Sequence, residues 1–503
     1  MLSVLHLCRS RCKYLSAMAL LLGAQTVFAA DLLPDLVEAG DIAEAESLIT
    51  AGADVNQLSV DGTTALHWAV YSGDEALITM LLENGANPNI SNDYGATPMT
   101  TAAESGNFNI LKALLEAGGD PESPNAEGQT LLMAVARTGN TDTARLLLDS
   151  GANVLARENW GGQTAIMWAA AQQHPEMIEL LITHGAEIND SSKEHDWPRW
   201  VTSEPRLKPL DSGGFTPLLY AAREGCADCA RALLDGGADI NMTDPWGVTP
   251  LIMAMLNLHY DTAALLIERG ADVRRWDWWG RTPLYVAIDL HRIPRSRRGD
   301  LPSTDSLTAL DLARTLLEKG GYVDMRLKKE PPFRSDPGDR GYTDGSPDSR
   351  VLNGGATALH KAAKEGDVDS VKLLLEYGAR VDIPNMVYEV TPLLTAAGVW
   401  RVYGIFSETP ITGVFKTENE SIEIISLLLE AGADISERAA NGHTVAHGAA
   451  GAGWNDVLQH VHELGADLGL PDVAGRTPRD LAIDAGFTDT VALIDALLAD
   501  SGD

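Results

Sequence analysis

Cys226 and Cys229 form the closest pair of thiols in the sequence and its only Cys-x-x-Cys. Two thiols at this spacing could supply half of a zinc site, act as a redox pair or join in a disulfide. No second cysteine pair or nearby histidine pair completes a zinc site, and the strand–helix context of a thioredoxin-like pair is missing. Across one helical turn the two Cα atoms would lie roughly 5 Å apart, which fits a disulfide in an oxidising compartment. A disulfide and two small apolar core side chains both stay open.

Catalytic chemistry has little support elsewhere in the chain. The sequence contains no serine-centred nucleophile elbow, no glycine-rich phosphate loop and no paired metal-binding motif. We therefore expect no catalytic residue, no cofactor and no bound metal, and the chain is predicted not to be an enzyme.

Tryptophan is concentrated just before threonines that recur along the chain. Trp246 and Trp279 each lie three residues before such a threonine, Trp278 lies four before one, and Trp276 is close by. Trp197 and Trp200 lie in an inserted segment. Indole rings side by side on a surface are typical of a binding site, so these six residues are candidates for partner binding. The alternative is that each ring packs flat on the neighbouring turn.

A second group of candidates is basic or apolar and lies in insertions. Residues 291–350 contain 12 Lys or Arg and 10 Asp or Glu, in a chain whose net charge is −33. This contrast predicts an electrostatically distinct patch, unless the arginines only keep a loop soluble. Tyr403 and Phe406 belong to an apolar insertion and are also candidates. The basic candidates are Arg292, Arg295, Arg297 and Arg298.

One threonine recurs with a basic period of 33 or 34 residues, and many copies are followed directly by proline. Threonine is a good helix N-cap, and proline after it loses no needed hydrogen bond. A glycine nine residues later and another after a leucine-rich run mark the ends of two short helices. Such helices are stable only when stacked on neighbours, so the period predicts a repeat fold. The threonines are Thr64, Thr97, Thr130, Thr164, Thr216, Thr249, Thr282, Thr357, Thr391, Thr444 and Thr477.

These units resemble the ankyrin repeat. Residues 61–69 read Asp-Gly-Thr-Thr-Ala-Leu-His-Trp-Ala, and residues 373–379 read Leu-Leu-Leu-Glu-Tyr-Gly-Ala. The resemblance implies an all-α solenoid of about 12 helix-turn-helix units and a role in binding other proteins. It also implies that His67, His360 and His447 hold turns through hydrogen bonds rather than catalyse a reaction.

The resemblance extends over essentially the whole chain after its first residues, so we expect one continuous solenoid over residues 30–503. Residues 31–60 are expected to form an N-terminal cap unit, residues 61–476 the repeats, and residues 477–503 a C-terminal cap unit. Gln173, Leu258 and Glu389 stand where other units have glycine. We expect the loops at these three residues to be distorted.

Four long loop insertions interrupt the repeat, near residues 190–210, 292–306, 327–353 and 399–420. The first and third are expected between units, and the second and fourth inside a unit, between its two helices. The fourth is rich in apolar residues and is predicted to form a β-hairpin, whereas the third is predicted to be a flexible excursion.

Residues 1–29 are typical of a secretory signal peptide. Arg9, Arg11 and Lys13 form a basic start, an uncharged stretch follows, and small residues Val27 and Ala29 favour cleavage near Ala29. The apolar stretch, about 15 residues, is too short to span a bilayer of roughly 30 Å, although an uncleaved anchor is the alternative. We expect an exported protein, periplasmic in a Gram-negative type envelope, with no transmembrane segment after cleavage.

The net charge of −33 excludes a general nucleic-acid binder, because the phosphate backbone would be repelled. The sequence favours a non-catalytic protein–protein interaction scaffold in the cell envelope, with a partner protein of unknown identity. A glycan-binding module that uses the tryptophans is the alternative. An enzyme built from the insertions at 190–210 and 399–420 is a third and weaker hypothesis.

Overall fold

The computed structural model describes residues 32–194, 213–292, 305–328, 354–399 and 416–500. Within these ranges it contains twenty-four α-helices and no strand. The helices form twelve antiparallel pairs, which confirms the prediction of an all-α fold of about twelve helix-turn-helix units. The first helices of the pairs are α1 (Leu33–Ala39), α3 (Ala65–Ser72), α5 (Pro98–Ser105), α7 (Leu131–Thr138), α9 (Ala165–Ala171), α11 (Pro217–Glu224), α13 (Pro250–Leu256), α15 (Pro283–His291), α17 (Ala358–Glu365), α19 (Pro392–Ala396), α21 (Val445–Ala452) and α23 (Pro478–Asp484). The second helices are α2 (Ile42–Thr50), α4 (Glu75–Glu83), α6 (Phe108–Glu116), α8 (Thr141–Asp149), α10 (Pro175–Thr183), α12 (Ala227–Asp235), α14 (Tyr260–Glu268), α16 (Ala309–Glu318), α18 (Val368–Glu376), α20 (Glu418–Glu430), α22 (Asn455–Glu463) and α24 (Thr488–Asp500).

The chain divides into two compact units. The first comprises Met1–Ala102 and Asn109–Asp120, and the second comprises Ala103–Phe108 and Pro121–Asp503. The single stack over residues 30–503, with cap units at 31–60 and 477–503, stays a prediction.

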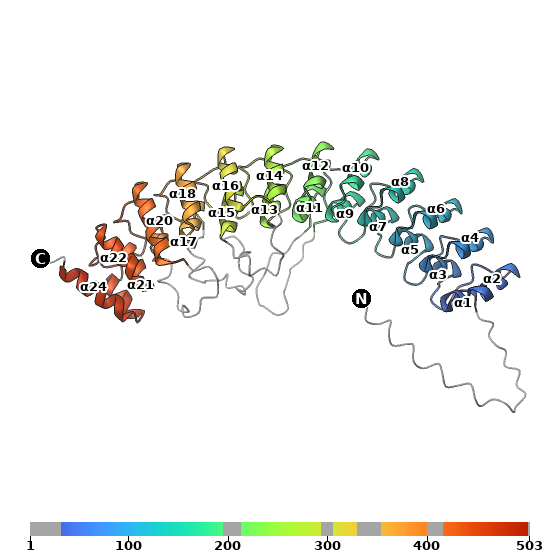
Figure 1. The fold of residues 1–503 in the computed structure, drawn as a ribbon, viewed down its shortest axis with the longest axis horizontal. Helices are drawn as coiled ribbons and strands as arrows, with labels where there is room; N and C mark the ends of the chain where they lie inside the picture. The colour runs from blue at the N-terminus through green and yellow to red at the C-terminus, as the bar shows by residue number, and fades with distance from the viewer. Residues whose placement is uncertain (1–31, 195–212, 293–304, 329–353, 400–415, 501–503) are drawn as a thin grey trace, which may run out of the picture. The chain divides into compact units, whose positions relative to one another are not determined.

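The second unit has two layers of helices. Each first helix packs against the first helices of neighbouring pairs, as α11 does against α9 and α13, and α12 packs in the same way against α10 and α14. Figure 1 shows these two rows from α7 and α8 onward. All seven residues of α13 are buried, whereas α14 buries only four of its nine residues. A helix such as α13 therefore needs apolar residues all round, whereas α14 needs only an apolar stripe.

The recurring threonines begin the first helices, as predicted. The Thr249 hydroxyl accepts a hydrogen bond from the Ile252 N–H at 3.2 Å, and Pro250 occupies the first helical position of α13. Side chains of this kind satisfy N–H groups that have no partner within the helix.

Glycine ends most of the first helices in a left-handed conformation, for example Gly225 with φ 74°. Gln173, Leu258 and Glu389 adopt φ values of 62°, 66° and 52°, and they are the only residues other than glycine with positive φ in the described ranges. Their loops keep the turn that glycine gives elsewhere, so the expected distortion is wrong. The unfavourable φ is borne by the residue itself.

The four predicted insertions lie mostly outside the described residues, and their extent stays a prediction. Residues 195–212 separate α10 from α11, and residues 329–353 separate α16 from α17, so both lie between pairs. Residues 293–304 lie between α15 and α16, the two helices of one pair, and residues 400–415 lie between α19 and α20, the two helices of another. The β-hairpin predicted within 399–420 lies outside the described residues. Among the described helices, none combines the length and apolar character needed to span a bilayer.

Candidate functional site

The turns that carry the candidate tryptophans are held by buried aspartates. Asp277 follows α14, and one of its carboxylate oxygens accepts hydrogen bonds from the N–H groups of Trp279 at 3.0 Å and Arg281 at 2.9 Å. Asp244 closes the preceding turn in the same way. A carboxylate that accepts two backbone N–H groups fixes the turn locally. The turns are therefore firm supports for the side chains that project from them.

Four tryptophans lie on these two turns, and we call them the tryptophan surface: Trp246, Trp276, Trp278 and Trp279. The ring of Trp246 stacks on that of Trp279 at 5.6 Å between centroids and meets the edge of Trp278 at 6.2 Å. The Trp278 N–H also donates to the Trp246 carbonyl at 2.8 Å. Trp276 and Trp278 remain 44% and 54% exposed. Trp246 and Trp279 therefore pack across neighbouring turns, while the other two rings offer area to a partner.

A buried ion pair lies beneath this surface. Arg281 donates to the second carboxylate oxygen of Asp277 at 2.6 Å, and both side chains are almost fully buried. The Arg281 guanidinium also lies 5.0 Å from the ring centre of Trp279. Sequence reasoning missed this pair, although Asp472 and Arg476 repeat the same spacing and form the same contact.

Three exposed cations continue from the tryptophan surface along neighbouring turns. The Lys328 N–H donates to the Trp279 carbonyl at 2.8 Å, and its ammonium lies 5.1 Å from the ring centre of Trp276. Arg274 donates to the Gly320 carbonyl at 2.8 Å. Arg326, two residues before Lys328, donates to the Pro384 carbonyl at 3.4 Å. We call Arg274, Arg326 and Lys328 the cation row.

Arg292 does not join the tryptophan surface. It lies just after the C-terminal end of α15, whereas Trp279 precedes the N-terminal end, and a helix of this length spans about 13 Å. Its guanidinium donates to the carbonyls of Glu365 at 2.8 Å and Gly366 at 2.6 Å, and to the Glu420 carboxylate at 2.9 Å. The structure therefore separates this candidate from the tryptophans.

Arg292 belongs to a polar cluster that surrounds the C-terminal end of α17. The buried Lys416 ammonium donates to the carbonyls of Ala363 at 3.1 Å and Ala396 at 2.6 Å. These bonds satisfy carbonyl groups at the ends of α17 and α19, where a positive charge is favourable. The His291 ring lies 2.7 Å from the Asp367 carboxylate, and this hydrogen bond raises the pKa of His291.

A buried lysine lies in the first-helix layer beside this cluster. Burial alone would lower the pKa of Lys361, but the carboxylates of Asp289 at 2.6 Å and Glu365 at 3.3 Å raise it overall. Burial also raises the pKa of the nearby Tyr285 hydroxyl. Lys361 is thus a charged group held by two carboxylates, not a neutral amine ready to act as a nucleophile.

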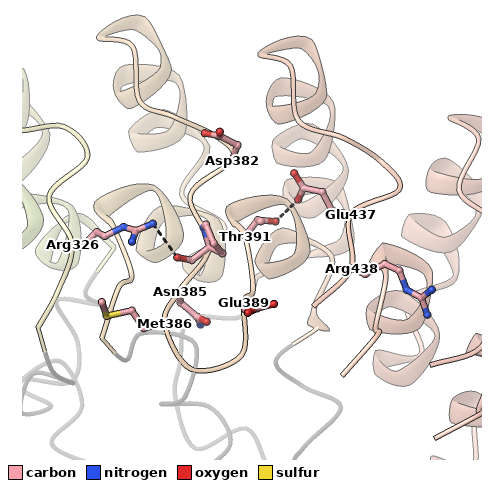
Figure 2. A pocket seen from close by; sticks show the side chains of 9 residues that line it. Arg326, Asp382, Asn385, Met386, Glu389, Thr391, Glu437 and Arg438 are labelled. Atoms are coloured by element: carbon pink, nitrogen blue, oxygen red, sulfur yellow. Dashed lines mark hydrogen bonds between the residues drawn. The ribbon is translucent and has the colours of Figure 1, made fainter. Parts of the chain in front are cut away.

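A cavity of about 470 Å³ opens where the cation row ends. Figure 2 shows the Thr391 hydroxyl donating to the Glu437 carboxylate, at 2.5 Å, across this cavity. Burial raises the pKa of Glu437. The lining carries both signs of charge, and it consists of Arg326, Asp382, Pro384, Asn385, Met386, Glu389, Thr391, Glu437 and Arg438.

Cys226 and Cys229 are joined by a disulfide, with their Cα atoms 5.2 Å apart. Cys226 is the N-cap of α12. At the equivalent position in other repeats, Asp74 caps α4 and Asn140 caps α8. The pair therefore lies at a helix start and away from the tryptophan surface.

The recurring histidines hold turns, as the repeat pattern predicts. His360 Nδ1 lies 3.1 Å from the Thr357 N–H, and Nε2 lies 3.0 Å from the Val390 carbonyl. Because an N–H can only donate, Nδ1 accepts and Nε2 carries the proton, so the ring is neutral. Burial lowers the pKa of His360 to about 4. Among the residues that the structure describes, no three His, Cys, Asp or Glu side chains are grouped to hold a metal ion.

The other candidates lie outside the described residues. They are Trp197, Trp200, Arg295, Arg297, Arg298, Tyr403 and Phe406.

Known proteins share the repeat. The family model for ankyrin repeats in three copies matches residues 35–125, 117–192 and 218–295, and the model for a single ankyrin repeat matches residues 354–386. The mouse B-cell lymphoma 3 protein homolog is 32% identical over 137 residues, which cover 27% of this chain and 26% of that protein. The rat cyclin-dependent kinase 4 inhibitor B is 32% identical over 154 residues, which cover 30% of this chain and 100% of that protein.

The alignment with a solved structure covers part of the chain. The human ASB11 ankyrin repeat domain aligns with a TM-score of 0.38 and 24% identity, and the alignment covers 48% of this chain and 98% of that domain. The family matches together cover more than half of the chain. The chain belongs to the ankyrin-repeat family.

Proposed function

We propose that this protein is a non-catalytic scaffold that binds another protein in the cell envelope. The single observation that carries the proposal is the tryptophan surface, where Trp276 and Trp278 stay about half exposed on turns fixed by buried aspartates. Tryptophan and arginine dominate the energetics of protein interfaces, and a rigid support lowers the entropy lost on binding.

Membership of the ankyrin-repeat family supports a protein partner. Ankyrin repeats mediate protein–protein interaction, and one relative is by its printed name an inhibitor of a kinase. In this chain, Trp276 and Trp278 are both about half exposed on one turn.

Affinity capture tests the partner. Full-length tagged protein is recovered from an envelope extract of the source cells, in parallel with the double variant Trp276→Ala/Trp278→Ala. We expect the native chain to retain a stoichiometric protein and the variant to lose it. Trp160→Ala is the matched control, because it removes an indole that is 69% exposed on another turn. Failure to capture a protein under several growth conditions contradicts the proposal.

Export is the second part of the proposal. Residues 1–29 support a cleaved signal peptide, and the disulfide between Cys226 and Cys229 supports an oxidising compartment. Cell fractionation followed by N-terminal sequencing is expected to find the chain in the periplasm, beginning at Ala30. Recovery of the uncleaved chain from the cytosol would remove the envelope from the proposal.

A glycan-binding module is the second candidate, and the same exposed rings favour it because indole faces stack on sugar rings. Titration with cell-wall glycans, followed by tryptophan fluorescence, separates the two functions. A saturable change that Trp276→Ala/Trp278→Ala abolishes would favour the glycan, and an unchanged signal removes this candidate.

A further inference from the structure

The three cations of the cation row have no carboxylate partner among the described residues. Arg274 donates to the Gly320 carbonyl, Arg326 donates to the Pro384 carbonyl, and the Lys328 ammonium lies over the Trp276 ring. All three side chains are exposed. Elsewhere in the second unit, exposed cations such as Arg380 and Lys372 pair with carboxylates at 2.9 Å and 2.7 Å.

The cation row lies in a strongly negative chain. Asp and Glu number 71 against 38 Lys and Arg, so a carboxylate partner is easy to find on the surface. A local group of exposed cations in a negative molecule attracts an anion to that place and repels it from the rest.

The cation row also has a defined extent. It begins beside Trp276, passes through Lys328 and Arg326, and ends at the cavity of Figure 2, where Asp382, Glu389 and Glu437 reverse the sign of charge. Backbone bonds from Lys328 to Trp279 and from Met386 to Gly354 join the neighbouring turns on which it lies. The positive segment therefore has aromatic area on one side and carboxylates on the other.

We infer that the tryptophan surface and the cation row together bind an acidic segment of the partner protein, with carboxylates on Arg274, Arg326 and Lys328 and an apolar side chain against Trp276 and Trp278. This inference rests on the proposed function and specifies the chemistry of its partner. The guanidinium groups of Arg274 and Arg326 each donate one hydrogen bond to a backbone carbonyl, and this bond orients the remaining N–H donors for a carboxylate. A partner segment with basic residues would instead meet three exposed cations.

Site-specific crosslinking tests the inference directly. A photo-reactive amino acid replaces Trp276 in the full chain, the protein is activated in the source cells, and the crosslinked peptide is sequenced by mass spectrometry. We expect a peptide in which Asp and Glu outnumber Lys and Arg and which contains an apolar residue. The control carries the same group at Val473, which is 78% exposed on a distant turn, and it is expected not to yield that peptide.

Once crosslinking has identified the partner, charge reversal tests the inference through the measured binding affinity. We expect Arg326→Glu/Lys328→Glu to weaken binding at low salt by about tenfold or more, because like charges then face each other. Arg314→Glu/Lys372→Glu changes the net charge equally on the second-helix layer and is expected to leave binding within about twofold.

The outcomes separate the inference from the proposed function. The acidic segment is overturned if the crosslinked peptide of a captured protein is basic or neutral. It is also overturned if the affinity of that protein is unchanged by Arg326→Glu/Lys328→Glu. Either result leaves the proposed scaffold function standing. A crosslink to an anionic glycan or lipid overturns both. Absence of any captured or crosslinked protein also contradicts both.

Discussion

The carboxylate of Asp277 does two tasks with its two oxygens. One oxygen closes the turn through backbone N–H groups, and the other neutralises the buried guanidinium of Arg281 beneath Trp279. A buried charge that loses its partner must be desolvated without compensation. The position of the exposed rings therefore depends on the ion pair of Asp277 and Arg281, which is itself buried.

Arg281→Ala is expected to lower the free energy of unfolding by about 3 kcal/mol, because Asp277 would stay buried and unpaired. Urea denaturation followed by circular dichroism measures the change. Arg380→Ala, which removes an exposed pair with Asp382, is the control and is expected to change the free energy of unfolding far less. Equal losses of unfolding free energy in the two variants would show that the buried pair stabilises the fold no more than the exposed pair does.

Glu389 illustrates strain at a single residue. Its φ of 52° falls where other turns have glycine, and its side chain is exposed. Glu389→Gly is therefore expected to raise the free energy of unfolding by about 1 kcal/mol. Gly475→Ala makes the reverse change at the equivalent turn, where an added Cβ meets nothing within 4 Å, and is expected to cost about as much. A destabilised Glu389→Gly variant would contradict the argument.

At the scale of elements, the glycine that ends a first helix is often covered by the residue that begins a second helix in the next repeat. A Cβ on Gly225 would clash with the His259 ring, and one on Gly139 would lie 2.5 Å from the His174 ring. His259 is the N-cap of α14, and His174 is the N-cap of α10. Such glycines are required both by the left-handed turn and by the close approach of the neighbour.

Gly225→Ala is accordingly expected to cost more than Gly486→Ala. Both residues have positive φ, but nothing lies within 4 Å of a Cβ at Gly486. The Gly486 variant isolates the conformational cost of about 1 kcal/mol, and the Gly225 variant adds about 1–3 kcal/mol from overpacking. Paired urea melts measure both, and equal costs would mean that His259 moves aside freely.

The elements could be predicted from the sequence, but most of the polar contacts between distant residues could not. Thr249 and Gly225 act locally, so their types and spacing give the helix boundaries directly. Arg292 and Glu420 are 128 residues apart, and their contact depends on the stacking of α15, α17 and α19. The tryptophans were recognised as candidates because they cluster near the turns, whereas the cation row was missed because Arg274, Arg326 and Lys328 come onto neighbouring turns only after the repeats pack.

At the scale of the whole molecule, buried histidines make stability depend on pH. His360 has a pKa of about 4 in the folded chain and about 6.5 when unfolded, so the unfolded state binds the extra proton between these values. His443 behaves in the same way, with a pKa lowered to about 4 by burial. His291 acts oppositely: its raised pKa adds stability below pH 6.5, which is lost as the pH rises through the folded value.

We expect the free energy of unfolding to be highest above pH 6.5 and to fall toward pH 4, with His360 alone contributing on the order of 3 kcal/mol. Urea midpoints at several pH values measure this slope. His360→Asn removes the titrating group and is expected to reduce the slope near pH 5 by about 1.4 kcal/mol per pH unit. An unchanged slope in that variant would show that His360 is not the group that titrates.

The bonds that Arg292, Lys416 and Glu420 make around the end of α17 bear on the evolution and redesign of this protein. The segments 293–304 and 400–415 are separated by more than a repeat in sequence. Arg292, just before the first segment, and Lys416 and Glu420, just after the second, nevertheless bond around the same helix end. Foreign sequences could be grafted into either segment if these three side chains are kept. Exchange of one segment together with its anchor would disturb the other, so natural variation at the two places is expected to be correlated.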